Sequence, residues 1–401
     1  MRQLFGTDGI RGVAGEAPLD EKTVYAVGLA LAHQLRPTAM GRMAETGTIS
    51  PRVILGRDTR ESSPWIARML TAGLKSGGAD VESAGVVPTP AVAYLAKKHG
   101  FDAGVVISAS HNPWQDNGIK VFGGDGKKLP DAAELAIEEV IFRHAVTSES
   151  PALETLPNLE DKREYANEYI QFLLETAPQL KLTDLKIVVD CANGAAAPIA
   201  PRLFADLHRR GGGDVTILNV APNGFNINAE CGALHPKAVA AETAARGAQI
   251  GITFDGDADR CLFSGANSNV INGDAVLLMA ARDLQARGLL TGDVVVATTM
   301  SNMGLEAALK RSGISMLRAA VGDRYVLEMM RERNAALGGE QSGHILFPHL
   351  ATTGDGMLTA LVVLDLVART GKTIEELTTD LKVFPQVIVN VRVKEKKPLL
   401  E

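Results

Sequence analysis

Short runs of β-branched and other apolar residues recur along the chain, and a polar loop follows each run at once. The runs are Val53–Leu55, Gly104–Ile107, Ile187–Val189 and Val294–Ala297. Continuous apolar runs of this length are typical of strands buried on both faces of a parallel sheet. Between them lie Ala- and Leu-rich stretches with helical spacing, namely 22–35, 65–75 and 275–285. The alternation predicts α/β units whose functional loops lie at the carboxyl ends of the strands.

The strand–loop–helix plan occurs three times, around Gly56, Asp190 and Thr298. Turn-rich stretches separate the three occurrences, and such stretches are typical of the seams between domains. We therefore expect three similar α/β domains with mainly parallel mixed sheets. The predicted domains are residues 1–157, 158–263 and 264–372. Within the first domain, the polar segment 37–51 is expected to be an inserted loop.

Composition restricts the class of protein further. The 401 residues include 46% hydrophobic and 22% charged residues, and the formal net charge is −6. A chain without a basic excess is a poor nucleic-acid binder. No apolar run approaches the roughly 20 residues of a membrane span, and the start carries no secretory signal. Three widely spaced cysteines form neither a disulfide framework nor a metal motif, so we expect a cytoplasmic protein with no membrane partner.

A group of three carboxylates is the strongest local signal. Asp255, Asp257 and Asp259 follow an apolar run directly. Carboxylates at every second position of an extended segment point to the same side, and their repulsion favours a hard cation such as Mg²⁺ between them. An EF-hand does not fit, because Arg260 and Ala266 stand where its loop needs Gly and Glu. The alternative is a solvated acidic turn, against which the flanking strand argues.

A second signal is the loop that contains Ser110. A serine hydroxyl is a weak nucleophile and needs a base or a metal to react. His111 and Lys120 are nearby candidates for proton transfer or charge stabilisation. The same segment also fits a plain strand-to-turn connection in which Asn112 and Pro113 make the bend. With a magnesium site elsewhere in the chain, phosphoryl transfer becomes the better interpretation.

A glycine-rich loop and scattered arginines supply weaker signals. Glycines at 338, 339 and 343 let the backbone approach a ligand, while Glu340, Ser342 and His344 can bind hydroxyl groups. A simple glycine-rich turn explains the same residues. Guanidinium groups suit phosphate oxygens, although a single arginine is more often a surface ion-pair partner. The arginines in predicted loops are Arg11, Arg57, Arg60, Arg260 and Arg324.

Together these motifs resemble those of the α-D-phosphohexomutase family. Residues 108–113 resemble its phosphoserine loop, 255–260 its metal loop and 339–344 its sugar-binding loop, in the family's order and over nearly the whole chain. The opening Phe5-Gly-Thr-Asp-Gly-Ile-Arg-Gly12, with Gln341, is similar to the bacterial branch that acts on glucosamine phosphate. It differs from the phosphomannomutase/phosphoglucomutase branch.

The resemblance implies a role for each candidate residue. Ser110 would carry a phosphoryl group, and one Mg²⁺ per chain would bind a phosphoserine oxygen with Asp255, Asp257 and Asp259. Lys120 would be the general acid/base, and the residues that help it would be Arg11, His111 and Arg260. The substrate-binding candidates are Glu340, Ser342, His344 and Arg324. Glucosamine 6-phosphate would become glucosamine 1-phosphate, a cell-wall precursor, through a hexose bisphosphate that is both intermediate and activator.

Members of the family continue into a smaller fourth, α+β domain whose loop holds the non-reacting phosphate. Residues 373–401 resemble only the start of that domain. We therefore expect a truncated form with reduced turnover, because binding of the remote phosphate positions the reacting end of the substrate. The resemblance also allows a homodimer.

Three alternatives remain open. The sugar preference can be that of a phosphoglucomutase or phosphomannomutase. A haloacid-dehalogenase-like phosphatase would carry its phosphate on Asp255 and would leave the loops of Ser110 and Glu340 without a role. A non-catalytic sugar-phosphate-binding homologue would never accept phosphate on Ser110.

Overall fold

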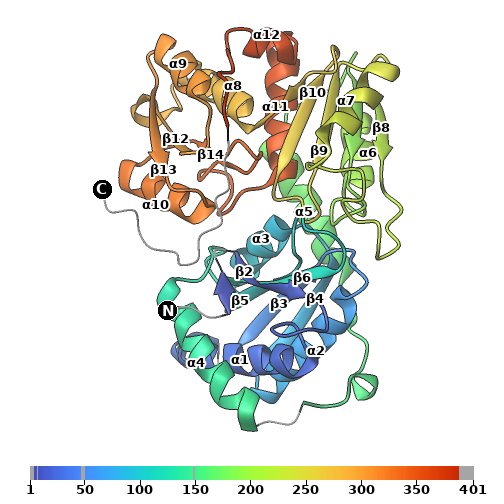
Figure 1. Ribbon diagram of the computed structural model, residues 1–401, viewed down its shortest axis with the longest axis vertical. Helices are drawn as coiled ribbons and strands as arrows, with labels where there is room; N and C mark the ends of the chain where they lie inside the picture. The colour runs from blue at the N-terminus through green and yellow to red at the C-terminus, as the bar shows by residue number, and fades with distance from the viewer. Residues whose placement is uncertain (1–3, 7, 47–49, 148–149, 388–401) are drawn as a thin grey trace.

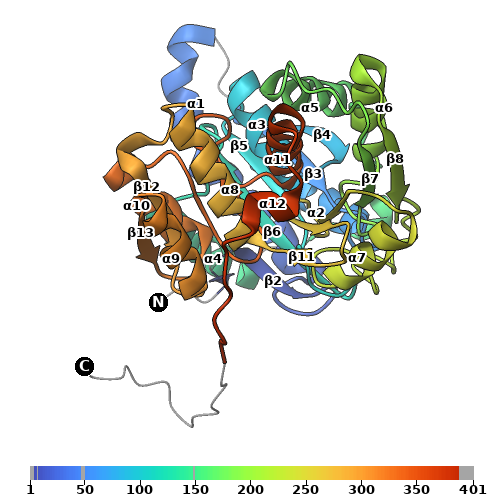
Figure 2. The ribbon, with the colours of Figure 1, turned by 90° about the horizontal axis from the view of Figure 1, so that it is seen from above.

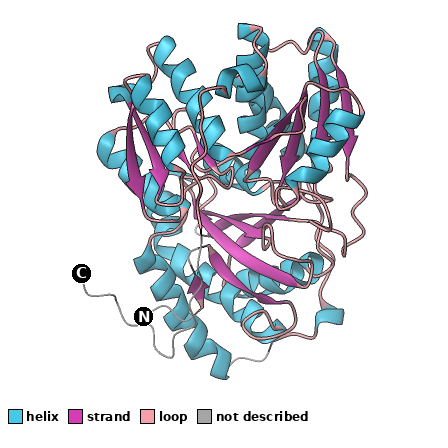
Figure 3. Cartoon of the chain, turned by 45° about the horizontal axis from the view of Figure 1, so that its top comes forward, coloured by secondary structure: helices cyan, strands magenta, loops and turns pink. Residues whose placement is uncertain are grey.

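The chain forms three α/β units, each built around its own sheet (Figure 1). A computed structural model describes residues 4–6, 8–46, 50–147 and 150–387. In Figure 1 the first unit lies at the bottom, and the second and third units lie side by side above it. The strands fall into three separate groups in Figure 3.

The first sheet has six strands and is covered by helices on both faces. The strands lie in the order β1 (Phe5–Gly6), β2 (Gly9–Val13), β6 (Asp116–Gly123), β5 (Ala103–Ile107), β3 (Arg52–Arg57) and β4 (Asp80–Val86). β3 is parallel to β4 and β5, and the remaining pairs are antiparallel. Its helices are α1 (Glu21–Thr46), α2 (Ser63–Ser76), α3 (Thr89–His99) and α4 (Asp131–Thr147). The first, second and fourth of them share a core with one face, and α3 covers the other.

The second sheet has five strands and a similar centre. The strands lie in the order β11 (Val270–Ile271), β10 (Cys261–Gly265), β9 (Ile250–Phe254), β7 (Lys186–Asp190) and β8 (Asp214–Leu218). β7 is parallel to β8 and β9, and β10 returns antiparallel to β9. Its helices are α5 (Arg163–Thr176), α6 (Ala200–Gly211) and α7 (Pro236–Ala245), and a 3₁₀ turn, η1 (Leu153–Thr155), precedes them.

The third sheet repeats this centre with short strands. The strands lie in the order β13 (Ser315–Ala319), β12 (Val294–Thr298), β14 (Gly338–Gly339) and β15 (Ile345–Leu346). β12 is parallel to β13 and β14, and β15 is antiparallel to β14. The remaining elements are α8 (Gly273–Ala286), η2 (Thr291–Asp293), α9 (Met303–Arg311), α10 (Asp323–Arg333), α11 (Gly356–Thr370) and α12 (Ile374–Thr378).

The shared strand order confirms the prediction of three similar α/β units with mixed sheets. Each sheet contains three parallel strands, with β3, β7 or β12 between its two parallel neighbours, and the next strand along the chain returns antiparallel. The parallel part of each sheet includes one edge strand, which is β4, β8 or β13. The central strands are buried along almost their whole length, which explains why their sequences read as continuous apolar runs.

The three units share one continuous core, which fixes their relative positions. Tyr94 of α3 stacks on Phe172 of α5 with ring centroids 4.3 Å apart. The hydroxyl of Tyr169 in α5 donates to Asp355, at the N-terminus of α11, over 2.9 Å. Seen from above, α11 and α12 lie between the second and third units (Figure 2). The loops at the strand ends of all three units are thus carried by a single packed body.

Two details of the predicted organisation differ from the structure. Helix α1 continues to Thr46, so most of the segment 37–51 is helical and not an inserted loop. The polar character of this segment predicted a loop, but it contains Ala, Met, Arg and Glu residues, which favour a helix. The predicted boundary at 263/264 falls inside β10, and β11 belongs to the same sheet. The turn between these strands has the composition of a linker, and we propose to place the boundary in front of α8.

The described part of the predicted fourth domain packs on the third unit. Ile374 is fully buried in the shared core, and Asp380 accepts two hydrogen bonds of 2.7 Å from Arg282. Residues 388–401, the rest of the segment assigned to that domain, lie outside the described residues. None of the helices in the described ranges has the length and apolar character needed to cross a membrane.

Candidate active site

The predicted site loops meet where the three units face one another. Ser110 follows β5, the carboxylates of Asp255, Asp257 and Asp259 follow β9, and the glycine-rich loop joins β14 to β15. All three loops leave the carboxyl ends of strands in the parallel parts of their sheets, where α/β proteins commonly bind ligands. The common topology therefore brings together residues that are more than 200 positions apart in sequence.

Ser110 points at the acidic loop of the second unit. Its side chain is buried, and its Oγ donates a hydrogen bond to Oδ2 of Asp255. Nδ1 of His111 lies 3.2 Å from the same Oγ. The backbone of Ser110 has a φ of 54°, in the left-handed region that costs free energy for a residue other than glycine. The surrounding contacts therefore hold this serine in a strained conformation toward the carboxylates.

The three carboxylates form a group that fits a metal ion. One oxygen from each of Asp255, Asp257 and Asp259 can be chosen so that all three lie within 4.8 Å of one another. All three side chains are buried, and Oδ1 of both Asp257 and Asp259 has no hydrogen-bond partner within the described ranges. Burial and the two neighbouring carboxylates raise the pKa of Asp255 well above its usual value. Unpartnered, clustered carboxylate oxygens are the donor set that Mg²⁺ prefers.

The carboxylates converge in a different way from the one that the sequence suggested. The segment after β9 is a turn, not an extended strand, and Ala258 within it has a φ of 54°. The small residues between the carboxylates permit this turn, which folds the three side chains toward one point. The predicted grouping is present, but its geometric reason was wrong.

Lys120, on β6, is the buried cation of the site. Its Nζ lies 2.8 Å from Oδ2 of Asp257, 3.0 Å from Oδ2 of Asp8 and 3.6 Å from Oδ2 of Asp259. Burial alone would lower the pKa of Lys120, but these carboxylates outweigh it and raise the pKa well above its usual value. In the absence of a bound cation, Lys120 therefore compensates part of the negative charge of the acidic loop.

Two arginines add positive charge around His111. Arg11 forms an ion pair with Asp8 and donates to the carbonyl of Ala109 over 3.4 Å. Nε of Arg260 lies 3.9 Å from Oδ1 of Asp259. Burial, followed by the charges of Arg260 and Arg11, lowers the pKa of His111 to about 4. His111 is accordingly neutral near pH 7 and can accept a proton.

The glycine-rich loop of the third unit reaches the same site. Glu340 accepts a hydrogen bond of 3.0 Å from the amide of Gly322, and the hydroxyl of Ser342 donates to Glu340 over 3.3 Å. The buried ring of His344 lies 3.7 Å from Asp259 and 3.6 Å from Asp323. Burial alone would lower the pKa of His344, but these carboxylates raise it to about 9.

Arg324 and Arg57 are placed away from the centre of this group. The guanidinium of Arg324 pairs with Asp131 of the first unit and with Glu328 of its own helix, the latter at 3.0 Å. Arg57 pairs with Asp161 at 2.7 Å, beside the segment that joins the first and second units. The structure thus does not bring either guanidinium to Ser110 or to the acidic loop.

Several site residues carried too weak a signal in the sequence to be selected. Lys128 bridges Asp8 at 2.6 Å and Asp323 at 2.9 Å, and so links the first and third units. Lys128 and Asp323 are isolated charges that belong to no motif, whereas Asp8 lies in the opening segment Phe5–Gly12. Arg60 stood among the loop arginines as a phosphate ligand, but its side chain is fully buried beneath the loop of Ser110.

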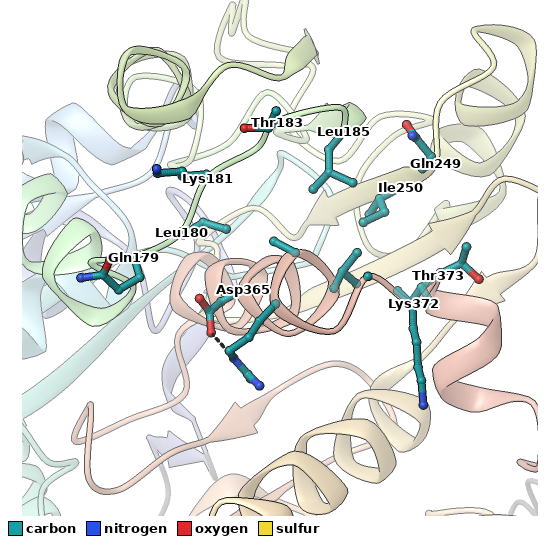
Figure 4. A pocket seen from close by; sticks show the side chains of 15 residues that line it. Gln179, Leu180, Lys181, Thr183, Leu185, Gln249, Ile250, Asp365, Lys372 and Thr373 are labelled. Carbon is teal, nitrogen blue, oxygen red and sulfur yellow. Dashed lines mark hydrogen bonds and ion pairs between the residues drawn. The ribbon is translucent and has the colours of Figure 1, made fainter.

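A groove of about 520 Å³ lies elsewhere, between the second and third units (Figure 4). Leu185 and Ile250, which line it, stand at the amino ends of β7 and β9. The acidic loop leaves the opposite, carboxyl end of β9. Because α/β sheets bind their ligands at carboxyl ends, we place the active site at Ser110 and not in this groove.

Comparison with protein families agrees with this assignment. The chain matches three domains described as phosphoglucomutase/phosphomannomutase, alpha/beta/alpha domains I, II and III, over residues 2–147, 167–268 and 272–384. These matches include each of the loops described above. The chain belongs to the phosphoglucomutase/phosphomannomutase family.

Individual relatives are more specific. The chain is 55% identical to a phosphoglucosamine mutase of Koribacter versatilis, over 100% of the chain and 85% of the relative. It is 50% identical to a phosphoglucosamine mutase of Solibacter usitatus, over 100% and 86%. Among solved structures, a phosphoglucomutase/phosphomannomutase family protein of Burkholderia thailandensis is 27% identical with a TM-score of 0.77, over 97% of this chain and 81% of that one.

Proposed function

We propose that this chain is a phosphoglucosamine mutase that interconverts glucosamine 6-phosphate and glucosamine 1-phosphate through a phosphoserine at Ser110. The observation that carries the proposal is the hydrogen bond from the hydroxyl of Ser110 to Asp255, within a cluster of three buried carboxylates. Relatives at 50–55% identity over the whole chain are phosphoglucosamine mutases, which supports the choice of sugar.

Each half of the reaction is one phosphoryl transfer. A sugar hydroxyl oxygen forms a bond to the phosphorus of the phosphoserine, and the bond between phosphorus and Oγ of Ser110 breaks. The product is a sugar bisphosphate. This intermediate reorients within the site and then returns its other phosphoryl group to Ser110. Such transfers depend on positioning and charge neutralisation more than on covalent catalysis.

Protons balance within each transfer, because the sugar hydroxyl loses one and Oγ of Ser110 gains one. We assign this exchange to His111 and Lys120. His111 is neutral near pH 7, and its Nδ1 lies 3.2 Å from Oγ. The ammonium of Lys120 is held among carboxylates at the same site and can donate a proton.

The acidic loop would hold one Mg²⁺ through Asp255, Asp257 and Asp259, together with an oxygen of the phosphoserine. When bound, the cation neutralises charge on the transferring phosphoryl group. Arg11 and Arg260 extend the positive field on the side of His111. A hexose bisphosphate would place the first phosphate on Ser110.

Recognition of the sugar is assigned to the third unit. Glu340 and Ser342 offer a carboxylate and a hydroxyl to sugar hydroxyl groups, and His344 offers a buried N–H. Arg324 was also predicted to bind substrate, but its present partners are carboxylates, and we propose that it contributes little to substrate binding. Cytoplasmic action and a homodimer complete the proposal, and sedimentation at several protein concentrations tests the second of these.

Turnover with glucosamine phosphates tests the proposal. Purified chain, Mg²⁺ and a trace of hexose bisphosphate are incubated with glucosamine 6-phosphate, and glucosamine 1-phosphate is measured by NMR. We expect product with the parent chain and none with Ser110→Ala. Faster turnover of glucose 6-phosphate than of glucosamine 6-phosphate would replace the sugar assignment. Release of free phosphate instead of the isomer would move the chain to the phosphatases.

A further inference from the structure

A fully buried arginine lies under the loop that carries Ser110. Nε of Arg60 donates to Oδ2 of Asp58 over 2.8 Å. One terminal nitrogen donates to the carbonyls of Ser110 and Asn112, both over 2.9 Å, and the other donates to the carbonyl of Pro113. The side chains of Arg60 and Asp58 have no exposed surface. One guanidinium thus gathers three backbone carbonyls of a single loop.

The carboxylate of Asp58 acts on the amide side of Ser110, through the hydroxyl of Ser108. Its Oδ2 accepts a hydrogen bond of 2.6 Å from the hydroxyl of Ser108, which itself accepts one of 2.9 Å from the amide of Ser110. Its Oδ1 accepts from Ser63 over 2.7 Å and from the amide of Arg60 over 3.0 Å. The buried pair therefore fixes both the N–H and the C=O of Ser110.

The second unit reaches the same carbonyls from the side of the acidic loop. Nδ2 of Asn228 donates to the carbonyl of Ser110 over 3.0 Å and to that of Asn112 over 3.2 Å. The amide of Glu61, next to Arg60, donates to the carbonyl of Gly224 over 2.9 Å. These contacts join the arginine, the serine loop and the second unit in one network.

This network does not contact the substrate, because its arginine and aspartate are covered on all sides. An unpaired buried charge would be costly, and here every charge is matched by a partner or by backbone dipoles. What the network does hold is the left-handed backbone of Ser110, which aims Oγ at Asp255. A misplacement of about 1 Å at a reacting atom can cost about 100-fold in rate.

We infer that Arg60, held by Asp58, is a positioning residue for the phosphoryl relay, and that its guanidinium fixes the main chain of the phosphoserine loop against the acidic loop. This inference rests on the proposed function for its kinetic consequence. The geometric part, that Arg60 immobilises residues 108–113, stands independently of turnover.

The test compares Arg60→Met, Arg60→Lys and a control, Arg68→Met. Arg68 lies in the same unit and also donates to two backbone carbonyls, but these belong to Leu153 and Leu156 and not to the loop of Ser110. We expect Arg60→Met to lower kcat and the rate of Ser110 phosphorylation by about 100-fold, with KM changed less than about threefold. Arg60→Lys should recover about tenfold of the loss, because it restores the charge without the planar fork.

Hydrogen exchange separates this inference from the proposed function. In Arg60→Lys the amides of 108–112 should exchange faster than in the parent, and in Arg68→Met they should not. If Arg60→Met fails to fold, the lysine variant carries the test. Equal exchange of this loop in parent and Arg60→Lys would overturn the inference, as would a folded Arg60→Met with kcat within about threefold of the parent. If the parent itself neither isomerises sugar phosphates nor accepts phosphate on Ser110, the proposed function fails, while faster exchange in Arg60→Lys still supports the positioning role.

Discussion

At the loop of Ser110, short hydrogen bonds between buried groups join the first and second units, whereas the glycine-rich loop of the third unit approaches the acidic loop over longer distances. Ser110 donates directly to Asp255, and Lys120 lies 2.8 Å from Asp257. On the sugar side, His344 stays 3.7 Å from Asp259 and 3.6 Å from Asp323. In the proposed reaction, the transferring phosphoryl group needs one fixed position, while a sugar that presents each of two oxygens in turn needs contacts that can readjust.

The largest effect is expected on the fixed side. Asp257→Asn removes one of three clustered charges and a partner of Lys120. We expect divalent-cation affinity to fall about 100-fold, by analogy with other metal-site substitutions, and phosphorylation of Ser110 to fall at least as much. Calorimetric titration with Mg²⁺ measures the first effect. Asp125→Asn, at an exposed carboxylate, is the control. Equal Mg²⁺ affinities in the two variants would show that Mg²⁺ does not bind at this loop.

Glu340→Gln tests the adjustable side. The change keeps the shape of the side chain and its contact to Gly322 but removes the charge that a sugar hydroxyl would meet. We expect kcat/KM to fall about 10- to 100-fold, the loss of a hydrogen bond to a charged group, with unchanged Mg²⁺ affinity. Glu332→Gln, on the exposed face of α10, should leave both unchanged. A parallel loss of Mg²⁺ affinity would show that the glycine-rich loop and the acidic loop act together and not independently.

A smaller effect is expected at the junction of α5 and α11 that supports both sides. Burial raises the pKa of Asp355 from 3.8 to about 6, although its hydrogen bonds act in the opposite direction. The folded state therefore binds this proton more tightly than the unfolded state, and the contribution of Asp355 to stability is lost as the pH rises from about 4 to about 6. Asp355→Asn should show a weaker decline of Tm over this range than the parent. An equal decline in both would assign the pH dependence to other groups.

The smallest effect is expected for Arg324→Gln. The guanidinium now pairs with half-exposed carboxylates, and such pairs contribute at most about 1 kcal/mol to stability. We expect Tm and kcat/KM close to those of the parent, measured by thermal unfolding and by the isomerisation assay. Arg318→Gln, which breaks a comparable pair with Glu306, is the control. A loss of kcat/KM in Arg324→Gln that is absent in Arg318→Gln would show that Arg324 binds the substrate after all.

The sequence predicted those parts of the site whose chemistry lies within one short segment. Ser110 and the three carboxylates each follow a recognisable buried strand, so their convergence at strand ends could be expected from topology. Arg60 could not be placed in the same way, because its partners are backbone carbonyls, which every residue type provides. The bridge from Asp8 through Lys128 to Asp323 was also hidden, since it forms only when distant units pack together. The turn at Ala258 depends on a backbone conformation that the Asp spacing does not encode.

Site-resolved mass spectrometry after incubation with a hexose bisphosphate and Mg²⁺ tests the central claim most directly, with Ser110→Ala measured alongside. The account predicts one phosphate on Ser110 of the parent chain and none on the variant. Phosphate on Asp255, or no phosphate anywhere on the folded parent chain, would contradict it.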